Sequence, residues 1–374
     1  MKNRYYFLIN SLEWWGAERV ITNISEHLHT DCDITIITLK NINFFDLPSH
    51  VHHLPLSNIK SNLLMFLCIP YYVWKLKKIL KREAFNGWMS SLEIANFVHI
   101  LANKHAKIAF ETSIYFFTWI IWFVHKLLIK LLYPKAKSIK VNSEENKYVL
   151  AAYLHIPLQK IEVIYNPIDL ITVERKKNED ISEDLKYKLK WKNVFITTWR
   201  LIPSKYHSKI ISALKKVYDT IDKNRIFLIL NDWNQRKILE QQVSDFWLQD
   251  NILFLGLQKN VFKYLNVSDG FLYASKVEWF PNVLIEAMAC DLFIITSNFK
   301  TGAEECILWS YNKRIDQCMK YPYYWPNGVL VDLSDYENNF LEVYRHLDSI
   351  KKGKIWFDKF DIHKISEQIL VFMD

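Results

Sequence analysis

Two glutamates have the clearest potential for chemistry in this chain. Glu278 and Glu286 stand eight positions apart in the run EWFPNVLIEAMAC. We expect a loop to hold Glu278 and a helix over 283–289 to hold Glu286, so that the first-turn amides near Asn282 and Val283 lie beside Glu278. A helix N-terminus favours an anion such as phosphate. The pattern therefore predicts phosphate at the helix start, with Glu286 accepting hydroxyl groups of a ribose further along.

Two cations earlier in the chain fit the same chemistry. Arg200 and Lys205 come directly after the apolar segment over 194–198. A guanidinium offers phosphate a planar fork, and an ammonium offers a mobile point charge. An isolated pair of this kind is usually a solvated surface feature. At a strand end ahead of a helix, it predicts binding of a diphosphate, whose leaving is the step that electrostatic stabilisation helps most.

The elements that must position these residues alternate between strands and helices. A first series opens with strands over 5–10 and 32–38, which flank a helix over 17–29. Its later strands are predicted over 108–111, 138–142 and 161–165. A second series has strands predicted over 194–198, 226–230, 252–255, 270–273 and 293–296. Such alternation is typical of parallel sheets, which bind ligands at the carboxyl ends of their strands.

The length of 374 residues suits two such α/β domains. We predict a first domain over 1–170, a linker or exposed helix within 171–190 and a second domain over 191–345. The remaining residues, 346–374, are expected to form a helical segment that crosses back to the first domain.

These motifs resemble the glycosyltransferase family 4 group of GT-B enzymes, whose second-domain signature reads EGFPNVLxEAMACGLPVI. The resemblance covers nearly the whole chain. Gly16 to Arg19 resemble the family's GGAER turn, and Asn166, Pro167 and Asp169 resemble its NPID. Further matches are Arg200, Leu201 and Lys205 in an RLxxxK pattern, Ser297, Gly302 and Glu305 in an SxxxxGxxE loop, and residues 328–331 in a terminal NGxLV.

The resemblance implies a GT-B fold, in which two Rossmann-like domains with parallel sheets face an interdomain cleft. It implies retaining transfer of a hexose or N-acetylhexosamine from a UDP- or GDP-sugar to a lipid-linked or polysaccharide acceptor. The nucleotide sugar is a substrate, and neither a further cofactor nor a metal is expected. The expected catalytic residues are Glu278, Arg200, Lys205 and Glu111, and the expected donor-binding residues are Gly16, Arg200, Lys205, Asn282, Val283 and Glu286.

One expected residue of the acceptor side is missing. Many relatives carry a histidine after the strand that ends near Glu111, and here that position is Thr112. Two other kinds of protein stay open as alternatives. One is a non-catalytic GT-B homologue that acts as a scaffold or interaction protein, and the other is a GT-B epimerase or phosphorylase, which the motif spacing disfavours.

Glycine is scarce and tryptophan abundant, with 7 and 14 residues respectively. An average protein has roughly 7% glycine. Several tryptophans stand where the family has glycine, namely Trp15, Trp199, Trp233 and Trp279, with Trp247 and Trp14 as further candidates. A glycine beside a diphosphate leaves room that an indole would fill. Either these tryptophans plug the site, or they are UGA codons that the source organism reads as glycine.

The positive charge is concentrated in the first half of the chain. The net charge is +8, and residues 1–165 hold 19 basic against 12 acidic residues. Two stretches, 63–82 and 114–132, combine apolar side chains with lysine or arginine but are too short or too interrupted to span a bilayer. They predict either peripheral contact with anionic lipid or ordinary amphipathic helices with a solvated basic face.

The remaining features of the sequence bear on the partners and the location of the protein. No nucleic-acid-binding motif accompanies the basic charge, so nucleic acid is not an expected partner. The five cysteines show neither a CxxC pair nor zinc spacing, which favours reduced thiols. The first residues lack the pattern of a secretory signal. We therefore expect a cytoplasmic protein, with peripheral contact to the inner face of the cell membrane.

Overall fold

The computed structural model describes residues 2–13, 16–28, 32–111, 120–278, 280–300, 302–308, 320–325, 327–347 and 359–374. The chain divides into two compact units, one of Met1–Pro167 with Asp358–Asp374 and the other of Ile168–Phe357. Each unit has its own seven-stranded sheet and its own hydrophobic core. The pair of Rossmann-like domains predicted from the sequence is confirmed.

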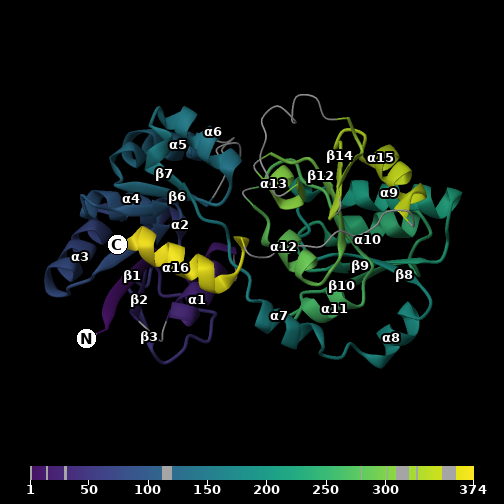
Figure 1. Cartoon of the computed structure of the whole chain (residues 1–374), viewed down its shortest axis with the longest axis horizontal. Helices are drawn as coiled ribbons and strands as arrows, with labels where there is room; N and C mark the ends of the chain where they lie inside the picture. The colour runs from purple at the N-terminus through teal and green to yellow at the C-terminus, as the bar shows by residue number, and fades with distance from the viewer. Residues whose placement is uncertain are drawn as a thin grey trace. The chain divides into compact units, whose positions relative to one another are not determined.

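The first unit is built on a parallel sheet with strand order β3-β2-β1-β4-β5-β6-β7 (Figure 1). Its strands are β1 (Asn3–Ile9), β2 (Cys32–Thr38), β3 (Val51–Pro55), β4 (Gly87–Ser91), β5 (Lys107–Ala109), β6 (Ser138–Val141) and β7 (Ile161–Val163). From β1 the chain first builds outward to β3 and then returns to β4 on the other side of β1. The carboxyl ends of β1 and β4 therefore form a switch point, where sheets of this kind bind ligands.

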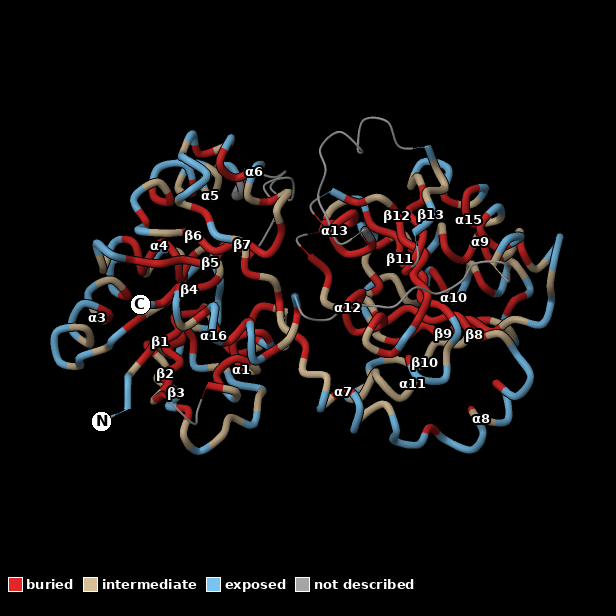
Figure 2. Tube along the Cα trace, viewed as in Figure 1, coloured by how far each residue is buried: buried red, intermediate tan, exposed pale blue. Residues whose placement is uncertain are grey.

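Both faces of this sheet are covered. Tyr5, Phe7 and Ile9 of β1 pack into one cluster, and Tyr6 and Leu8 pack into another. The first cluster includes residues of α1 (Gly16–His27) and α16 (Ile362–Met373), and the second includes residues of α3 (Ile69–Arg82) and α4 (Glu93–Ala102). Burial on both sides explains the near-continuous apolar runs of these strands (Figure 2).

The C-terminal helix α16 belongs to this first unit. It packs against α1 and β4, and the hydroxyl of Tyr5 donates a hydrogen bond to Asp374 Oδ1 at 2.9 Å. Gly87 permits the close approach, since a Cβ there would lie 2.7 Å from the carbonyl oxygen of Met373. The described end of the segment expected over 346–374 thus packs with the first sheet, while residues 348–358 lie outside the described ranges.

The second unit carries a sheet with strand order β10-β9-β8-β11-β12-β14-β13. Its strands are β8 (Asn193–Thr197), β9 (Arg225–Leu230), β10 (Ile252–Gly256), β11 (Gly270–Tyr273), β12 (Phe293–Ser297), β13 (Tyr323–Trp325) and β14 (Gly328–Val331). All pairings are parallel except that of β13 with β14. The switch point of this sheet lies between β8 and β11, the two strands that precede the predicted phosphate-binding residues.

The stretch expected to link the domains is mostly helical and is part of the second unit. It contains α7 (Leu170–Lys177) and α8 (Glu183–Leu189). Asp169 caps α7 by accepting a hydrogen bond from the amide of Thr172 at 3.0 Å. Val173, Leu185 and Leu189 are buried, so this stretch is packed rather than a free linker.

Two helices of the second unit end on tryptophans in the left-handed backbone region. Trp191 follows α8 with a φ of 62°, and Trp247 follows α10 (Arg236–Asp245) with a φ of 57°. At Trp247 the amide bonds to the carbonyl of Ser244, and the next amide, of Leu248, bonds to the carbonyl of Val243, both at 3.0 Å. This pair of bonds defines a helix end that usually requires glycine at the left-handed position.

Candidate functional site

A buried ion pair lies at the carboxyl end of the second sheet. Lys205 ends a short 3-10 helix over Pro203–Lys205 after β8, and Glu278 lies in the loop after β11. The ammonium of Lys205 donates to Glu278 Oε1, which also accepts a hydrogen bond from the hydroxyl of Tyr273 at 2.7 Å. All three side chains are buried. A buried pair needs such additional bonds, because they offset the cost of removing both charges from water.

Two cations, Lys205 and Arg200, interact with Glu278. Burial lowers the pKa of Lys205, while the charge of Glu278 acts in the opposite direction. Burial also lowers the pKa of half-buried Arg200, which is likewise attracted to Glu278. Nearby His207 is neutral, since burial and the charge of Lys205 lower its pKa to about 3. Arg200 and Lys205 together supply the positive charge that an anion needs at this point.

The helix after β11 supplies the remaining predicted donor residues. Helix α12 (Asn282–Ala289) begins with Asn282 and Val283 in its first turn, and Glu286 lies one turn further with 9% of its surface exposed. The loop before α12 is fixed by Ser275 and Ser297. The Ser297 hydroxyl accepts from the amide of Ser275 at 2.8 Å and donates to its carbonyl at 2.7 Å. Ser297 therefore ties the ends of β11 and β12 together.

Trp199 covers the lysine of this site. The ammonium of Lys205 lies 4.5 Å from the centre of the Trp199 ring, and that ring also packs edge-on against Tyr273. The indole Nε1 is buried without a hydrogen-bond partner among the described residues. An indole thus occupies space beside Lys205 at a position where the family resemblance expects glycine. Trp15 and Trp279, the other predicted neighbours, lie outside the described residues.

The two remaining predicted site residues belong to the first unit. Gly16 is the first residue of α1, and Glu111 follows β5. Glu111 is buried and forms an ion pair of 3.1 Å with Lys140 of β6, which is also buried. Thr112 and the residues up to 119 lie outside the described ranges.

Several partners of the predicted residues were not singled out from the sequence. Tyr273 and His207 contact or influence the buried pair of the second unit, and Lys140 pairs with Glu111. Lys140 could have been noticed in the sequence, because it is a charged residue between the apolar Ile139 and Val141 of the strand SIKV. No sequence pattern indicated the role of the Tyr273 hydroxyl, because a tyrosine in the strand GFLY is equally typical of a plain core.

Grouped metal ligands are not found in the described part of the chain, where no three His, Cys, Asp or Glu side chains come together.

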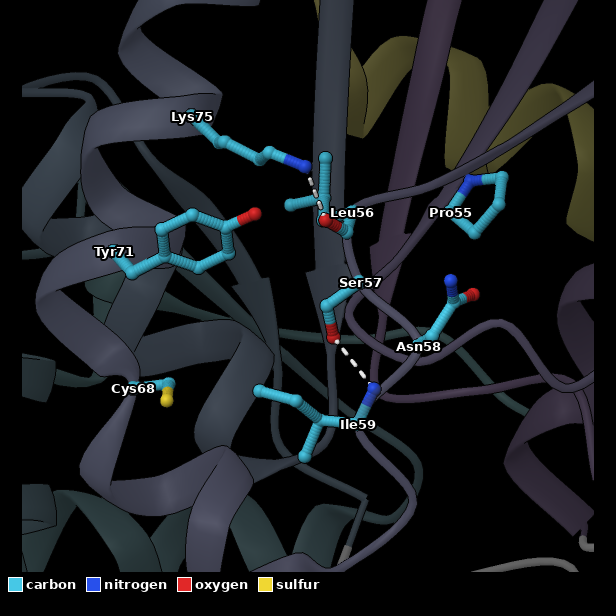
Figure 3. A pocket seen from close by; sticks show the side chains of 8 residues that line it. All are labelled: Pro55, Leu56, Ser57, Asn58, Ile59, Cys68, Tyr71 and Lys75. Atoms are coloured by element: carbon cyan, nitrogen blue, oxygen red, sulfur yellow. Dashed lines mark hydrogen bonds between the residues drawn. The ribbon is translucent and has the colours of Figure 1, made fainter.

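A pocket of about 580 Å³ lies in the first unit, between the residues after β3 and helix α3 (Figure 3). It is lined by Pro55, Leu56, Ser57, Asn58, Ile59, Cys68, Tyr71 and Lys75. The ammonium of Lys75 donates to the carbonyl of Leu56 at 2.5 Å. This pocket contains none of the predicted site residues.

Two models of glycosyltransferase families together match most of the chain. Residues 179–313 match the family model of glycosyl transferases group 1, and residues 14–171 match that of glycosyltransferase family 4. The chain is 30% identical over 307 residues to an N-acetylgalactosamine-N,N'-diacetylbacillosaminyl-diphospho-undecaprenol 4-alpha-N-acetylgalactosaminyltransferase of Campylobacter jejuni, covering 79% of this chain and 81% of that protein. It is 27% identical to an Escherichia coli UDP-Gal:alpha-D-GlcNAc-diphosphoundecaprenol alpha-1,3-galactosyltransferase, over 41% of each chain.

Solved structures show the same fold at low sequence identity. HepE of Anabaena in complex with UDP superposes with a TM-score of 0.74 at 17% identity, covering 99% of both chains. Sucrose-phosphate synthase of Thermosynechococcus elongatus gives a TM-score of 0.74 at 14% identity, covering 99% of this chain and 98% of that one. The expected GT-B fold is confirmed.

Proposed function

Since the chain belongs to the group 1 and family 4 glycosyltransferases, we propose that it is a retaining enzyme that transfers a sugar from a UDP-sugar to a polyprenyl diphosphate-linked glycan. The observation that carries the proposal is the buried Lys205–Glu278 pair beside Arg200, at the carboxyl ends of β8 and β11. The activities named for the two bacterial relatives support a diphospho-undecaprenol acceptor, and the HepE complex supports UDP.

The residues of the site have different roles in sugar transfer. Arg200 and Lys205 neutralise the diphosphate as its bond to the sugar C1 breaks, which is where added charge stabilisation counts most. Glu278 and Tyr273 hold the ammonium of Lys205 in place before the donor binds. The amides at the start of α12 bind phosphate oxygens, and Glu286 accepts ribose hydroxyls. The acceptor hydroxyl attacks C1 on the face that the phosphate leaves, and its proton passes to that phosphate.

Product analysis tests the proposal. Purified protein is incubated with UDP-GalNAc, UDP-GlcNAc, UDP-galactose, UDP-glucose or GDP-mannose and a farnesyl diphosphate-linked N-acetylhexosamine. We expect transfer from one of the UDP-sugars, with an α-linkage in the product by NMR because the donor is α-linked. A β-linkage would refute retention, and transfer from GDP-mannose alone would refute the choice of UDP.

We infer further that the first unit contacts an anionic membrane through an apolar–basic surface on α2 (Asn62–Leu67), α3 and α5 (Ile120–Leu132). Helices α2 and α5 lie side by side, since the rings of Phe66 and His125 stack with centroids 5.2 Å apart. The exposed apolar residues of this surface are Leu63, Leu64, Leu67, Tyr71, Trp74, Phe123, Val124, Leu127 and Leu131. Its exposed basic residues are Lys77, Lys78, Lys81, Arg82 and Lys130.

Exposure favours the lipid interpretation over an ordinary amphipathic helix. An ordinary surface helix buries its apolar side, whereas here Leu63, Leu67 and Phe123 each expose more than half of their surface. The three helices contain no Asp or Glu, so nothing on them repels an anionic headgroup. Among the described residues no helix is long and apolar enough to cross a bilayer, which leaves contact at the interface as the mode that this surface suits.

Vesicle binding tests this surface. The protein should sediment with vesicles that contain phosphatidylglycerol, and much less with pure phosphatidylcholine or in high salt. Changing Lys77, Lys78, Lys81 and Arg82 to Gln should lower binding by about 100-fold or more, at about 1 kcal/mol per basic residue. The triple change of Leu63, Leu67 and Phe123 to Ser should have a similar effect.

A matched control uses apolar residues that are equally exposed on the second unit. Ile171 and Leu257 expose 75% and 78% of their surface, and their change to Ser should leave vesicle binding unaltered. Equal binding by the control and the triple variant would show that the apolar–basic surface is not the contact.

A further inference from the structure

Buried polar atoms without partners collect at one edge of the first sheet. They are Glu18 Oε2, Ser91 Oγ and Asn142 Nδ2, and no described residue accepts from or donates to them. Glu18 lies in the first turn of α1, which follows β1, Ser91 ends β4, and Asn142 follows β6. All three therefore stand at the carboxyl edge of the sheet, and the first two flank its switch point.

Charged groups surround Glu18 at this edge. Glu13 forms an ion pair of 3.8 Å with Lys40, and Glu111 forms the pair with Lys140. Burial raises the pKa of Glu18 to about 8. A hydrogen bond from the backbone of Glu18 and the charge of Lys40 oppose this rise in pKa, and the charges of Glu13 and Glu111 add to it. At neutral pH the Glu18 carboxyl is therefore mainly protonated, with one hydroxyl donor and one acceptor oxygen.

Neighbouring residues fix the positions of Asn142 and Ser91. Asn142 Oδ1 accepts a hydrogen bond from Asn146 Nδ2 at 3.1 Å, which orients the amide and leaves its own donor unused. Ser91 pairs in register with Ala109, two residues before Glu111. An unsatisfied buried polar atom costs roughly 1–3 kcal/mol. Three such atoms at one sheet edge point to a ligand that carries both donors and acceptors.

We propose that Glu18, Ser91 and Asn142 bind hydroxyl or acetamido groups of the acceptor sugar. The proposal rests on the transferase function given above and adds residues to its acceptor side, where Thr112 stands in place of the usual histidine. A sugar matches the three groups, because each of its hydroxyls both donates and accepts. Ordered water would satisfy the same atoms, and the experiment separates the two.

The experiment compares two variants of one residue. Glu18→Ala should raise the KM for a farnesyl diphosphate-linked N-acetylhexosamine by about 10-fold, as expected for about 1.4 kcal/mol of lost hydrogen bonding. The KM for the UDP-sugar should change by less than about twofold. Glu18→Gln keeps a donor and an acceptor and should restore the acceptor KM to within about threefold. Ser91→Ala and Asn142→Ala should each raise the acceptor KM in the same direction.

The pH profile separates binding from a purely structural effect. Because the protonated carboxyl is the binding form, the acceptor KM of the unaltered chain should rise as the pH passes through about 8. In Glu18→Gln that rise should disappear, since the amide does not titrate.

Ser25 provides a matched control on the same helix. Its hydroxyl is also buried without a partner, but it lies two turns further along α1, toward the opposite edge of the sheet. Ser25→Ala should leave both KM values unchanged. An acceptor KM in Glu18→Ala equal to that in Ser25→Ala would overturn the inference in favour of water. So would a Glu18→Gln variant as impaired as Glu18→Ala, because it would indicate a packing role.

Direct binding keeps this inference distinct from the proposed function. Affinity for the same farnesyl-linked probe is measured by calorimetry without donor. Failure of the unaltered chain to bind or modify the probe would contradict the proposed acceptor and this inference with it. Equal binding by the unaltered chain and Glu18→Ala would contradict only the role of Glu18.

Discussion

Lys205→Ala should lower kcat/KM for the UDP-sugar by about 10²–10³-fold. Loss of one group that stabilises developing charge costs about 2.7–4 kcal/mol in enzymes, and Lys205 pairs directly with Glu278, whose charge also acts on Arg200. The measurement is steady-state transfer at saturating acceptor. Glu286→Ala should show a loss of about 2–4 kcal/mol by the same comparison, through weaker ribose binding at α12.

Lys205→Ala will also affect folding, so activity needs a second measurement beside it. Removing one partner of a buried ion pair typically costs about 3–5 kcal/mol of stability, because the other charge is left buried. The double change Lys205→Met with Glu278→Gln removes both charges at once. It should recover most of the thermal midpoint without recovering transfer.

Lys215 supplies the control for this prediction. It also pairs with a carboxylate, that of Asp219 at 2.5 Å, but on the exposed surface of α9 (His207–Thr220). Lys215→Ala should change stability by less than about 1 kcal/mol and should not affect transfer. Near-normal turnover in Lys205→Ala, or restored turnover in the double variant, would contradict the role of Lys205 at the diphosphate.

The fold was largely predictable because most strands of both sheets are short apolar runs bounded by helical segments. Four strands were missed. β3 and β4 have the sequences VHHLP and GWMSS, which mix polar with apolar residues and resemble loops, and β13 and β14 are only three and four residues long. The segment of α7 and α8 was predicted to be a linker or an exposed helix because its sequence is highly charged. Three buried side chains, Val173, Leu185 and Leu189, are enough to attach them to the second unit.

The candidate site was predictable mainly through motifs. Arg200, Lys205 and Glu278 were expected near one another, yet no local rule joins Lys205 to Glu278 across 73 positions. That pairing follows from the parallel topology, which brings the ends of β8 and β11 together. Residues that act only through tertiary contact, such as Tyr273 and Lys140, were invisible because their types are compatible with a plain strand. The backbone angles of Trp191 were equally hidden.

The second large effect is expected at Trp199. Trp199→Gly should increase affinity for a UDP-sugar by about 10-fold or more in a thermal-shift or calorimetric titration. In the present sequence the Trp199 ring lies over the ammonium of Lys205, and removing the ring exposes that charge to phosphate. Donor affinity that is unchanged in Trp199→Gly would show that the indole does not block the site.

The backbone gives a separate test of whether these positions are naturally glycine. Trp191→Gly and Trp247→Gly should each stabilise the protein, because a left-handed conformation costs a side-chain-bearing residue roughly 1–2 kcal/mol and glycine almost nothing. Both side chains are more than 80% exposed, so little packing is lost. Trp74→Gly is the control, since Trp74 is exposed in the middle of α3, where glycine should instead destabilise by about 1 kcal/mol.

The change to glycine would then stabilise the protein at positions 191 and 247 but destabilise it at position 74. This result would relate the scarcity of glycine to backbone geometry rather than to tryptophans that plug the site. The same explanation requires UGA codons, read as glycine in the source organism, at the predicted positions 15, 199, 233 and 279. It also requires them at 191 and 247, where φ is positive as it is at Trp233. UGG codons at these positions would exclude it. In that case the left-handed tryptophans would be genuine strain in this chain, and Trp199 would be a true cover over Lys205. If the codons are UGA, the native donor site is the one with glycine at 199, and kinetic constants should be measured on that form.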